Sequence, residues 1–205
     1  MQRDSAHGAD GREKLMGYIY DEILNLTSSP LYGERVKNNY YPVIGQGSCY
    51  AEIMFVGEAP GKTEALTGVP FCGRAGKILD ALLKSVDIGR EDVYITNIVK
   101  DRPPKNRDPL SEEIALYAPF LDRQIEIVQP KVIATLGRFS MAYSMEKFRL
   151  SDALDSIHKI HGKVFDARAS YGAIKIIPLY HPAAMIYNPS IRKVMEKDFQ
   201  ILKNY

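Results

Sequence analysis

Residues able to do chemistry stand where apolar runs of this sequence end. Glu58 follows one such run after a single glycine, His181 follows another directly, and Asn97 is the last residue of a third. A carboxylate can orient a water molecule, and a carboxamide can pair with the donor and acceptor edge of a base. An imidazole can donate a hydrogen bond to an oxygen that gains negative charge. Each residue type is also common in structural roles, so the elements that hold these residues decide whether they form a site.

Four apolar runs predict strands that are buried on both faces of a sheet. They cover residues 51–56, 92–97, 131–136 and 174–180. Helical spacing of apolar residues occurs in four further segments, over residues 12–26, 78–86, 111–128 and 189–202. Ser111 is expected as the N-cap of the third helix, and Pro189 in the first turn of the last.

Strands that alternate with helices predict an α/β fold, here a three-layer α/β/α sandwich around a mostly parallel, four-stranded central sheet. The carboxyl ends of parallel strands meet at one edge, where the ligands of such sheets bind. Glu58, Asn97 and His181 are therefore expected at one site.

The composition sets further expectations. The chain has 205 residues, 45% hydrophobic and 25% charged, which predicts one domain over residues 12–205 behind a flexible polar tail, 1–11. Without an apolar run of spanning length or a signal-peptide core, we expect a monomeric cytoplasmic protein without membrane contact. The net charge is only +2, so nucleic acid would bind at local basic clusters, such as Lys100, Arg102, Lys105 and Arg107.

Five blocks of the sequence, in this order, resemble the uracil-DNA glycosylase superfamily and within it the family-4 enzymes. They are Ile53–Gly61, Gly68–Gly76, Asp92–Lys100, Arg102–Pro104 and Pro178–Pro182. The resemblance extends over roughly residues 26–202. It implies a DNA repair enzyme that flips uracil out of single- or double-stranded DNA. Such an enzyme hydrolyses the N-glycosidic bond and leaves an abasic site.

The resemblance also implies roles for the pocket residues. Phe71 would stack on uracil and Asn97 would pair with its N3–H and O4. His181 would donate to O2, and Glu58 would orient the water or stabilise the sugar cation. Glu64 would shape the pocket, lined further by the backbone of Gly57, Ala59 and Gly61.

Other residues are expected to bind DNA. Met185, Ile186 and Tyr187 follow His181 as the intercalating loop does in the superfamily. Arg192 and Lys193 would hold phosphates, and so would Arg74 at a helix N-terminus.

One departure concerns the iron–sulfur cluster that four cysteines hold in family-4 enzymes. Those positions fall here on Leu26, Ser29, Asp101 and Tyr117. The chain has only two cysteines, Cys49 and Cys72, so we expect no cluster, no other cofactor and no metal site. Apolar packing of Leu26 and Tyr117 could replace part of the cluster's support.

Three alternatives remain open from the sequence. The chain could remove another deaminated or mismatched base, because single pocket residues set that choice. It could be a DNA-binding relative that is catalytically weakened. A nucleotide-binding α/β protein is the third, although neither common phosphate-binding motif is present.

Overall fold

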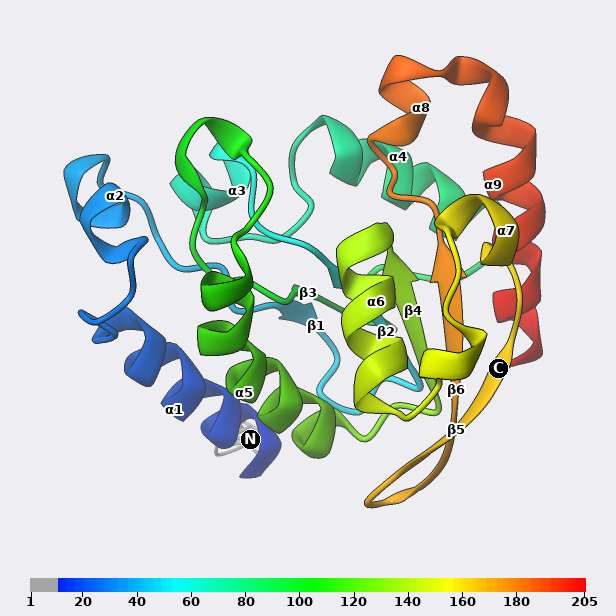
Figure 1. The fold of residues 1–205 in the computed structure, drawn as a ribbon, viewed down its shortest axis with the longest axis horizontal. Coiled ribbons are helices and arrows are strands. Elements are labelled where there is room, and N and C mark those ends of the chain that lie inside the picture. Colours follow the sequence, from blue (N-terminus) through cyan, green and yellow to red (C-terminus); the bar gives the residue numbers. More distant parts are fainter. Residues whose placement is uncertain (1–10) are drawn as a thin grey trace, which may run out of the picture.

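The central sheet has six strands in the order β1-β3-β2-β4-β6-β5 in the computed structural model, which describes residues 11–205 (Figure 1). The strands are β1 (Gln46–Gly47), β2 (Ile53–Gly57), β3 (Tyr94–Asn97), β4 (Val132–Leu136), β5 (Phe165–Ala169) and β6 (Gly172–Leu179). β2, β3, β4 and β6 are parallel neighbours, and β1 and β5 pair antiparallel at the two edges. The mostly parallel α/β sheet is confirmed, but the prediction of four strands is wrong.

The two additional strands, β1 and β5, lack the continuous apolar run that predicted the other four. β1 has only two residues, both exposed. β5 alternates between half-buried and exposed residues and forms a hairpin with β6. Edge strands are covered on fewer sides than central ones, so their sequences need no continuous apolar run.

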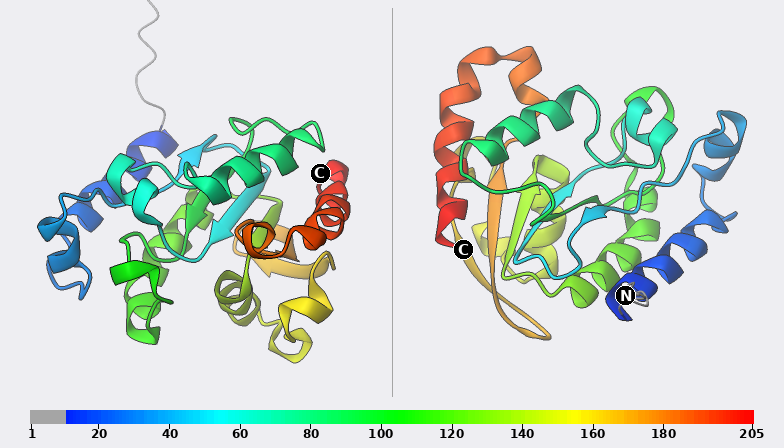
Figure 2. Two further views of the ribbon diagram at one scale, coloured as in Figure 1. Left: turned by 90° about the horizontal axis from the view of Figure 1, so that it is seen from above. Right: turned by 180° about the vertical axis from the view of Figure 1, so that it is seen from behind.

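Successive residues of β2 point to opposite faces of the sheet, and each face has its own core. Met54 and Val56 pack with α1 (Gly11–Leu24), α5 (Ser111–Val128) and α6 (Arg138–Lys147). Ile53 and Phe55 pack with α4 (Arg74–Lys84) and α9 (Arg192–Phe199). Figure 2 shows α5 and α6 on the side of the sheet opposite to α4, which gives three layers.

Short helices fill the loops. They are α2 (Tyr32–Lys37), α3 (Lys62–Thr67), η1 (Pro104–Asn106), η2 (Ser151–Ala153), α7 (Ile157–Ile160), α8 (Ala184–Tyr187), η3 (Pro189–Ile191) and η4 (Gln200–Asn204). Loops that follow the parallel strands, with α3, η1 and α8, gather at the carboxyl edge of the sheet (Figure 1).

Two helix predictions need correction. The helix expected over 189–202 is three consecutive pieces, η3, α9 and η4. Ser111 is the first residue of α5 rather than its N-cap, which is Leu110. The Leu110 N–H donates instead to the Glu113 carboxylate at 2.8 Å, so a residue inside the helix satisfies this donor.

The tail predicted for residues 1–11 lies outside the described residues except for Gly11, which begins α1. Within the described part of the chain, no helix combines the length and the apolar character that a membrane span requires.

Candidate active site

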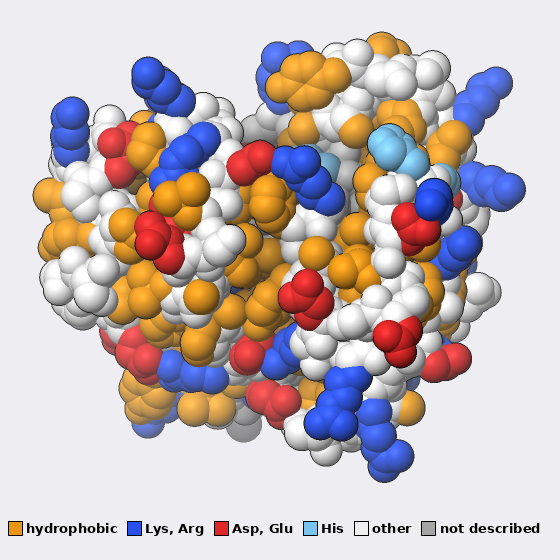
Figure 3. All heavy atoms as spheres, viewed as in Figure 1, with side chains coloured by type: hydrophobic (Ala, Val, Ile, Leu, Met, Phe, Trp, Pro, Cys, Tyr) orange, Lys and Arg blue, Asp and Glu red, His pale blue; other side chains and the backbone are white. Residues whose placement is uncertain are grey.

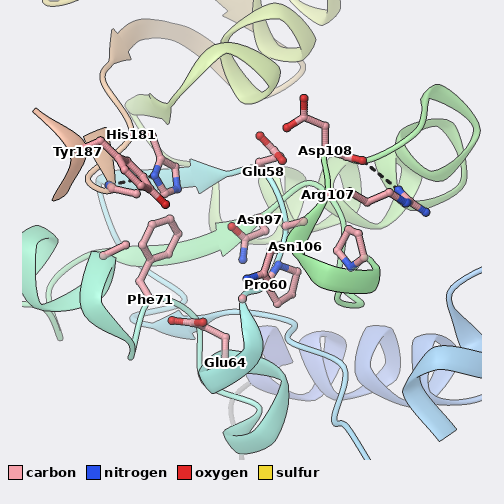
Figure 4. Close-up of a pocket in the computed structure, with 15 residues that line it drawn as sticks. Glu58, Pro60, Glu64, Phe71, Asn97, Asn106, Arg107, Asp108, His181 and Tyr187 are labelled. Atoms are coloured by element: carbon pink, nitrogen blue, oxygen red, sulfur yellow. Dashed lines mark hydrogen bonds between the residues drawn. The ribbon is translucent and has the colours of Figure 1, made fainter. Parts of the chain in front are cut away.

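A cavity of about 450 Å³ opens at the carboxyl edge of the sheet. Its walls come from the β2–α3 turn, the loop before α4, the end of β3, the loop around η1 and the segment after β6. Glu58, Asn97 and His181 all line it, as their shared strand-end positions predict, and Phe71 lines it too, as the superfamily resemblance implies (Figure 4). Ala59, Gly61 and Glu64 line it as well.

Main-chain hydrogen bonds tie the ends of β2 and β3 together beneath this cavity. The Ile98 N–H donates to the Gly57 carbonyl, and the Val99 N–H donates to the Glu58 carbonyl, both at 3.0 Å. The turn that carries Glu58 is therefore fixed against the segment that begins at Asn97.

Gly57 does not line the cavity but allows two pocket side chains to meet above it. A Cβ at Gly57 would lie 2.3 Å from Asn97 Oδ1 and 2.7 Å from Phe71 Cζ, both far inside contact distance. A Cβ at Gly76 would lie 1.7 Å from the Phe71 carbonyl oxygen. Both glycines are thus required by close approach, and together they let the Phe71 ring pack beside the carboxamide.

Phe71 itself is held in a conformation that few non-glycine residues adopt. Its φ is +47°, in the left-handed region, and its side chain is only 5% exposed. A residue keeps such a strained conformation only where the surrounding structure holds it there. Such residues are frequent at ligand-binding sites. The ring centroid lies 5.6 Å from that of His181, so the two rings form one wall of the cavity.

Asn97 presents an unpaired acceptor. Its Oδ1 is buried and has no hydrogen-bond donor among the described residues. Buried polar atoms are nearly always paired in native proteins, so an exception inside a cavity indicates a ligand that supplies the donor.

His181 is a neutral imidazole with a defined tautomer. Its Nδ1 accepts a hydrogen bond from the Ala183 N–H at 3.1 Å, so the proton of the neutral ring lies on Nε2. Burial lowers the pKa of His181 to about 4, although the Glu64 carboxylate opposes this shift. At neutral pH the ring can therefore donate from Nε2 without carrying charge.

Glu58 has a pKa suited to proton chemistry near neutrality. Burial raises the pKa of Glu58, the negative charge of Asp108 raises it as well, and Arg138 opposes both, so that the pKa is about 7. Asp108 and Arg138 form an ion pair with each other beside the cavity. Sequence reasoning missed Asp108, because it lies in an irregular loop with no motif that marks it.

Glu64 has a structural contact within the site. Its Oε1 accepts the Gly73 N–H at 2.7 Å, which ties α3 to the N-terminus of α4. This bond holds the loop that carries Phe71.

Comparison with known proteins decides the family, since residues 44–203 match the uracil DNA glycosylase superfamily. The chain belongs to this superfamily. It is 45% identical to a type-4 uracil-DNA glycosylase of Saccharolobus solfataricus, over 90% of this chain and 83% of that protein. It is 39% identical to one of Thermotoga maritima, over 95% and 96%, and 30% identical to a type-5 enzyme of Pyrobaculum aerophilum, over 72% and 68%.

The residues that the superfamily resemblance assigns to DNA differ in their exposure and in their distance from the cavity. Tyr187 lines the cavity and is 87% exposed, whereas Met185 and Ile186 are partly buried. Arg192 is exposed and pairs with Glu196 at 2.7 Å, and Lys193 beside it is exposed too. Arg74 is exposed at the N-terminus of α4. Figure 3 shows basic side chains along the upper edge of this face, on both sides of a hollow.

The predicted basic cluster of the loop after β3 is mostly absent. Lys100 is fully buried, Arg107 pairs with the buried Glu113, and Arg102 donates to Tyr40. Only Lys105 of the four is exposed without a bond of this kind. The four basic residues lie close together in the sequence, but they do not form a basic patch on the surface.

The four positions at which the resemblance places cluster cysteines do not fit an iron–sulfur cluster here. Tyr117 OH donates to Asp101 Oδ2 at 2.6 Å and lies 2.8 Å from Ser29 Oγ. Arg35 pairs with Asp101 at 3.0 Å and donates to the carbonyls of Ile23 and Leu24. These residues offer no thiolate, the ligand by which such clusters are mainly held.

Apolar packing alone does not describe this region. Leu26 and Tyr117 do pack in the core, as expected. The Tyr117 hydroxyl, however, is the centre of a buried hydrogen-bonded network of Ser29, Arg35, Asp101 and Tyr117, which we call the Tyr117 network. Arg35 gave no sequence signal, because only the folded chain brings it to Asp101.

Proposed function

We propose that this chain is a monofunctional uracil-DNA glycosylase that extrudes uracil from DNA and hydrolyses its N-glycosidic bond. The observation that carries the proposal is the convergence of three groups on one cavity. They are the Phe71 ring, the unpaired Asn97 carboxamide oxygen and the neutral His181 with its proton on Nε2. The relatives named as type-4 uracil-DNA glycosylases support it.

Recognition depends on Phe71 and Asn97. The uracil ring stacks on Phe71, as aromatic faces favour. Uracil N3–H donates to Asn97 Oδ1, and the Asn97 amide N–H donates to O4. Cytosine presents the opposite pattern at both positions, so its binding would leave two buried polar pairs unmatched.

Cleavage transfers the electron pair of the C1′–N1 bond to the base. The His181 Nε2–H donates to uracil O2, where negative charge develops, and stabilises the leaving anion. The ionised Glu58 carboxylate stabilises the cationic sugar and orients a water, whose oxygen bonds to C1′. The proton that this water loses passes to Glu58 and then to solvent, and uracil leaves as an anion that solvent protonates.

DNA is held around the mouth of the cavity. Tyr187 is the wedge that fills the vacated stack, because it is the most exposed of the three candidates. Arg74, Arg192 and Lys193 contact phosphates, and the enzyme works without an iron–sulfur cluster. The protein as purified is therefore expected to be colourless and free of iron in elemental analysis.

The test is excision by the purified protein at excess over a labelled oligonucleotide with one uracil, followed by alkali. Matched oligonucleotides carry cytosine, thymine opposite guanine, or hypoxanthine, each as a single and as a double strand. Cleavage at uracil alone is the expected result. Cleavage only at another base would assign a different substrate, and no cleavage of any strand would refute the enzyme.

A further inference from the structure

A buried lysine, Lys100, contacts the backbone of Asn97, the residue proposed to recognise the base. Lys100 has no exposed surface. Its Nζ donates to the main-chain carbonyl of Asn97 and to Gln124 Oε1, both at 2.5 Å, and to Thr96 Oγ1 at 2.8 Å. Lysine is almost never fully buried unless it is paired, and burial lowers the pKa of Lys100 well below its usual value. Burial of this ammonium group is energetically unfavourable, so Lys100 is expected to have a specific role at this position.

The partners of Lys100 are themselves anchored. Gln124 Nε2, on α5, donates to the Ile44 carbonyl at 3.0 Å and to Tyr94 OH at 3.2 Å. Thr96 Oγ1 donates to the same Ile44 carbonyl at 2.5 Å. Lys100 therefore connects the end of β3 to a rigid support formed by α5 and the segment before β1.

The bond to Asn97 fixes the peptide group next to the Cα from which its carboxamide projects. An asparagine side chain has only two rotatable bonds, so a displacement of this backbone moves the carboxamide with it. The next two residues, Ile98 and Val99, hold the β2 end through Gly57 and Glu58. The Lys100 bond lies on the other side of this short segment, so both sides of the Asn97 backbone are fixed.

We infer that Lys100 is a positioning residue, which orients the Asn97 carboxamide for uracil by holding its main-chain carbonyl. The inference rests on the proposed role of Asn97. Loss of Lys100 should lower the rate of uracil excision through Asn97, and not only through the stability of the fold. Small displacements of a positioning group can reduce a rate by about a hundredfold.

The experiment is a double-mutant cycle of Lys100→Met and Asn97→Ala, measured by single-turnover excision of uracil and by thermal unfolding. Tyr117→Phe is the control, because it removes a buried hydroxyl from the Tyr117 network and leaves every hydrogen bond of Lys100 in place. Lys100→Gln, which is polar but ends one atom short of the Nζ position that reaches the Asn97 carbonyl, replaces Lys100→Met if that variant does not fold.

Lys100→Met should reduce the wild-type rate by about 10- to 100-fold, but the Asn97→Ala rate by less than about twofold, since sites that act through one another are not additive. Tyr117→Phe should lower the melting temperature and keep a rate within about threefold of wild type. Equal losses in both backgrounds, or an equal loss in Tyr117→Phe, would overturn the inference. A fully active Asn97→Ala would overturn it together with the role of Asn97, whereas an inactive wild type would refute the proposed function itself.

Discussion

The main-chain N–H of Ala183 donates to Nδ1 of His181 and so fixes the tautomer of this imidazole. Pro182, between the two residues, biases the His181 backbone toward an extended conformation. The backbone around His181 thus orients the ring before substrate is present. A donor that is already oriented can stabilise a developing anion without any reorganisation of the protein.

Replacement of His181 by alanine is expected to lower the single-turnover rate by about 10²–10³-fold, because one donor to the leaving anion is lost. Affinity for uracil-containing DNA should change little, since the contact strengthens mainly in the transition state. Rate, affinity and melting temperature measured on one preparation test this. A folded variant that cleaves within about threefold of wild type would remove His181 from the mechanism.

The rate should rise with pH through about 7, because Glu58 acts as a carboxylate and its pKa is raised to about 7. Asp108 contributes to that rise, so Asp108→Asn should move the inflection to lower pH. Arg138→Gln should move it to higher pH, because the charge that opposes the rise is removed. A profile that is the same in all three proteins, or one that persists in Glu58→Gln, would assign the inflection to another group.

The Asn97→Asp variant is expected to lose uracil activity by about 10- to 100-fold, since an ionised carboxylate cannot donate to O4. Discrimination against cytosine should weaken at the same time, because a protonated aspartate can donate to cytosine N3. Competition between uracil and cytosine oligonucleotides in one reaction measures both effects. An unchanged uracil rate would place Asn97 outside the recognition step.

The Tyr117→Phe variant should lower the free energy of unfolding by about 1–3 kcal/mol, because Asp101 and Ser29 each lose one buried hydrogen-bond partner. Tyr143→Phe is the control, since the Tyr143 hydroxyl also bonds a carboxylate, that of Asp122, in a more exposed place. The decrease in the free energy of unfolding should be smaller for Tyr143→Phe than for Tyr117→Phe. Equal losses in denaturant titrations would show that the Tyr117 network contributes nothing beyond an ordinary tyrosine–aspartate bond.

The features of this fold that could be predicted from the sequence are those that depend on the burial of the strands. The four parallel strands are apolar runs because both of their faces are covered, and the sheet rule then brings Glu58, Asn97 and His181 together. Lys100 could not be predicted as buried, because its partner Gln124 lies 24 residues away on α5. Asp108 beside Glu58 depends in the same way on the path of a loop.

The backbone strain at Phe71 has a consequence for what happens after cleavage. Because Phe71 is buried and packs closely over Gly57 and Gly76, the surface proposed to receive uracil is formed before any base arrives. Free uracil keeps the same flat face, N3–H and two carbonyl oxygens that the pocket recognises in DNA. The enzyme should therefore retain affinity for its own released base, so that accumulation of uracil slows further turnover by competition.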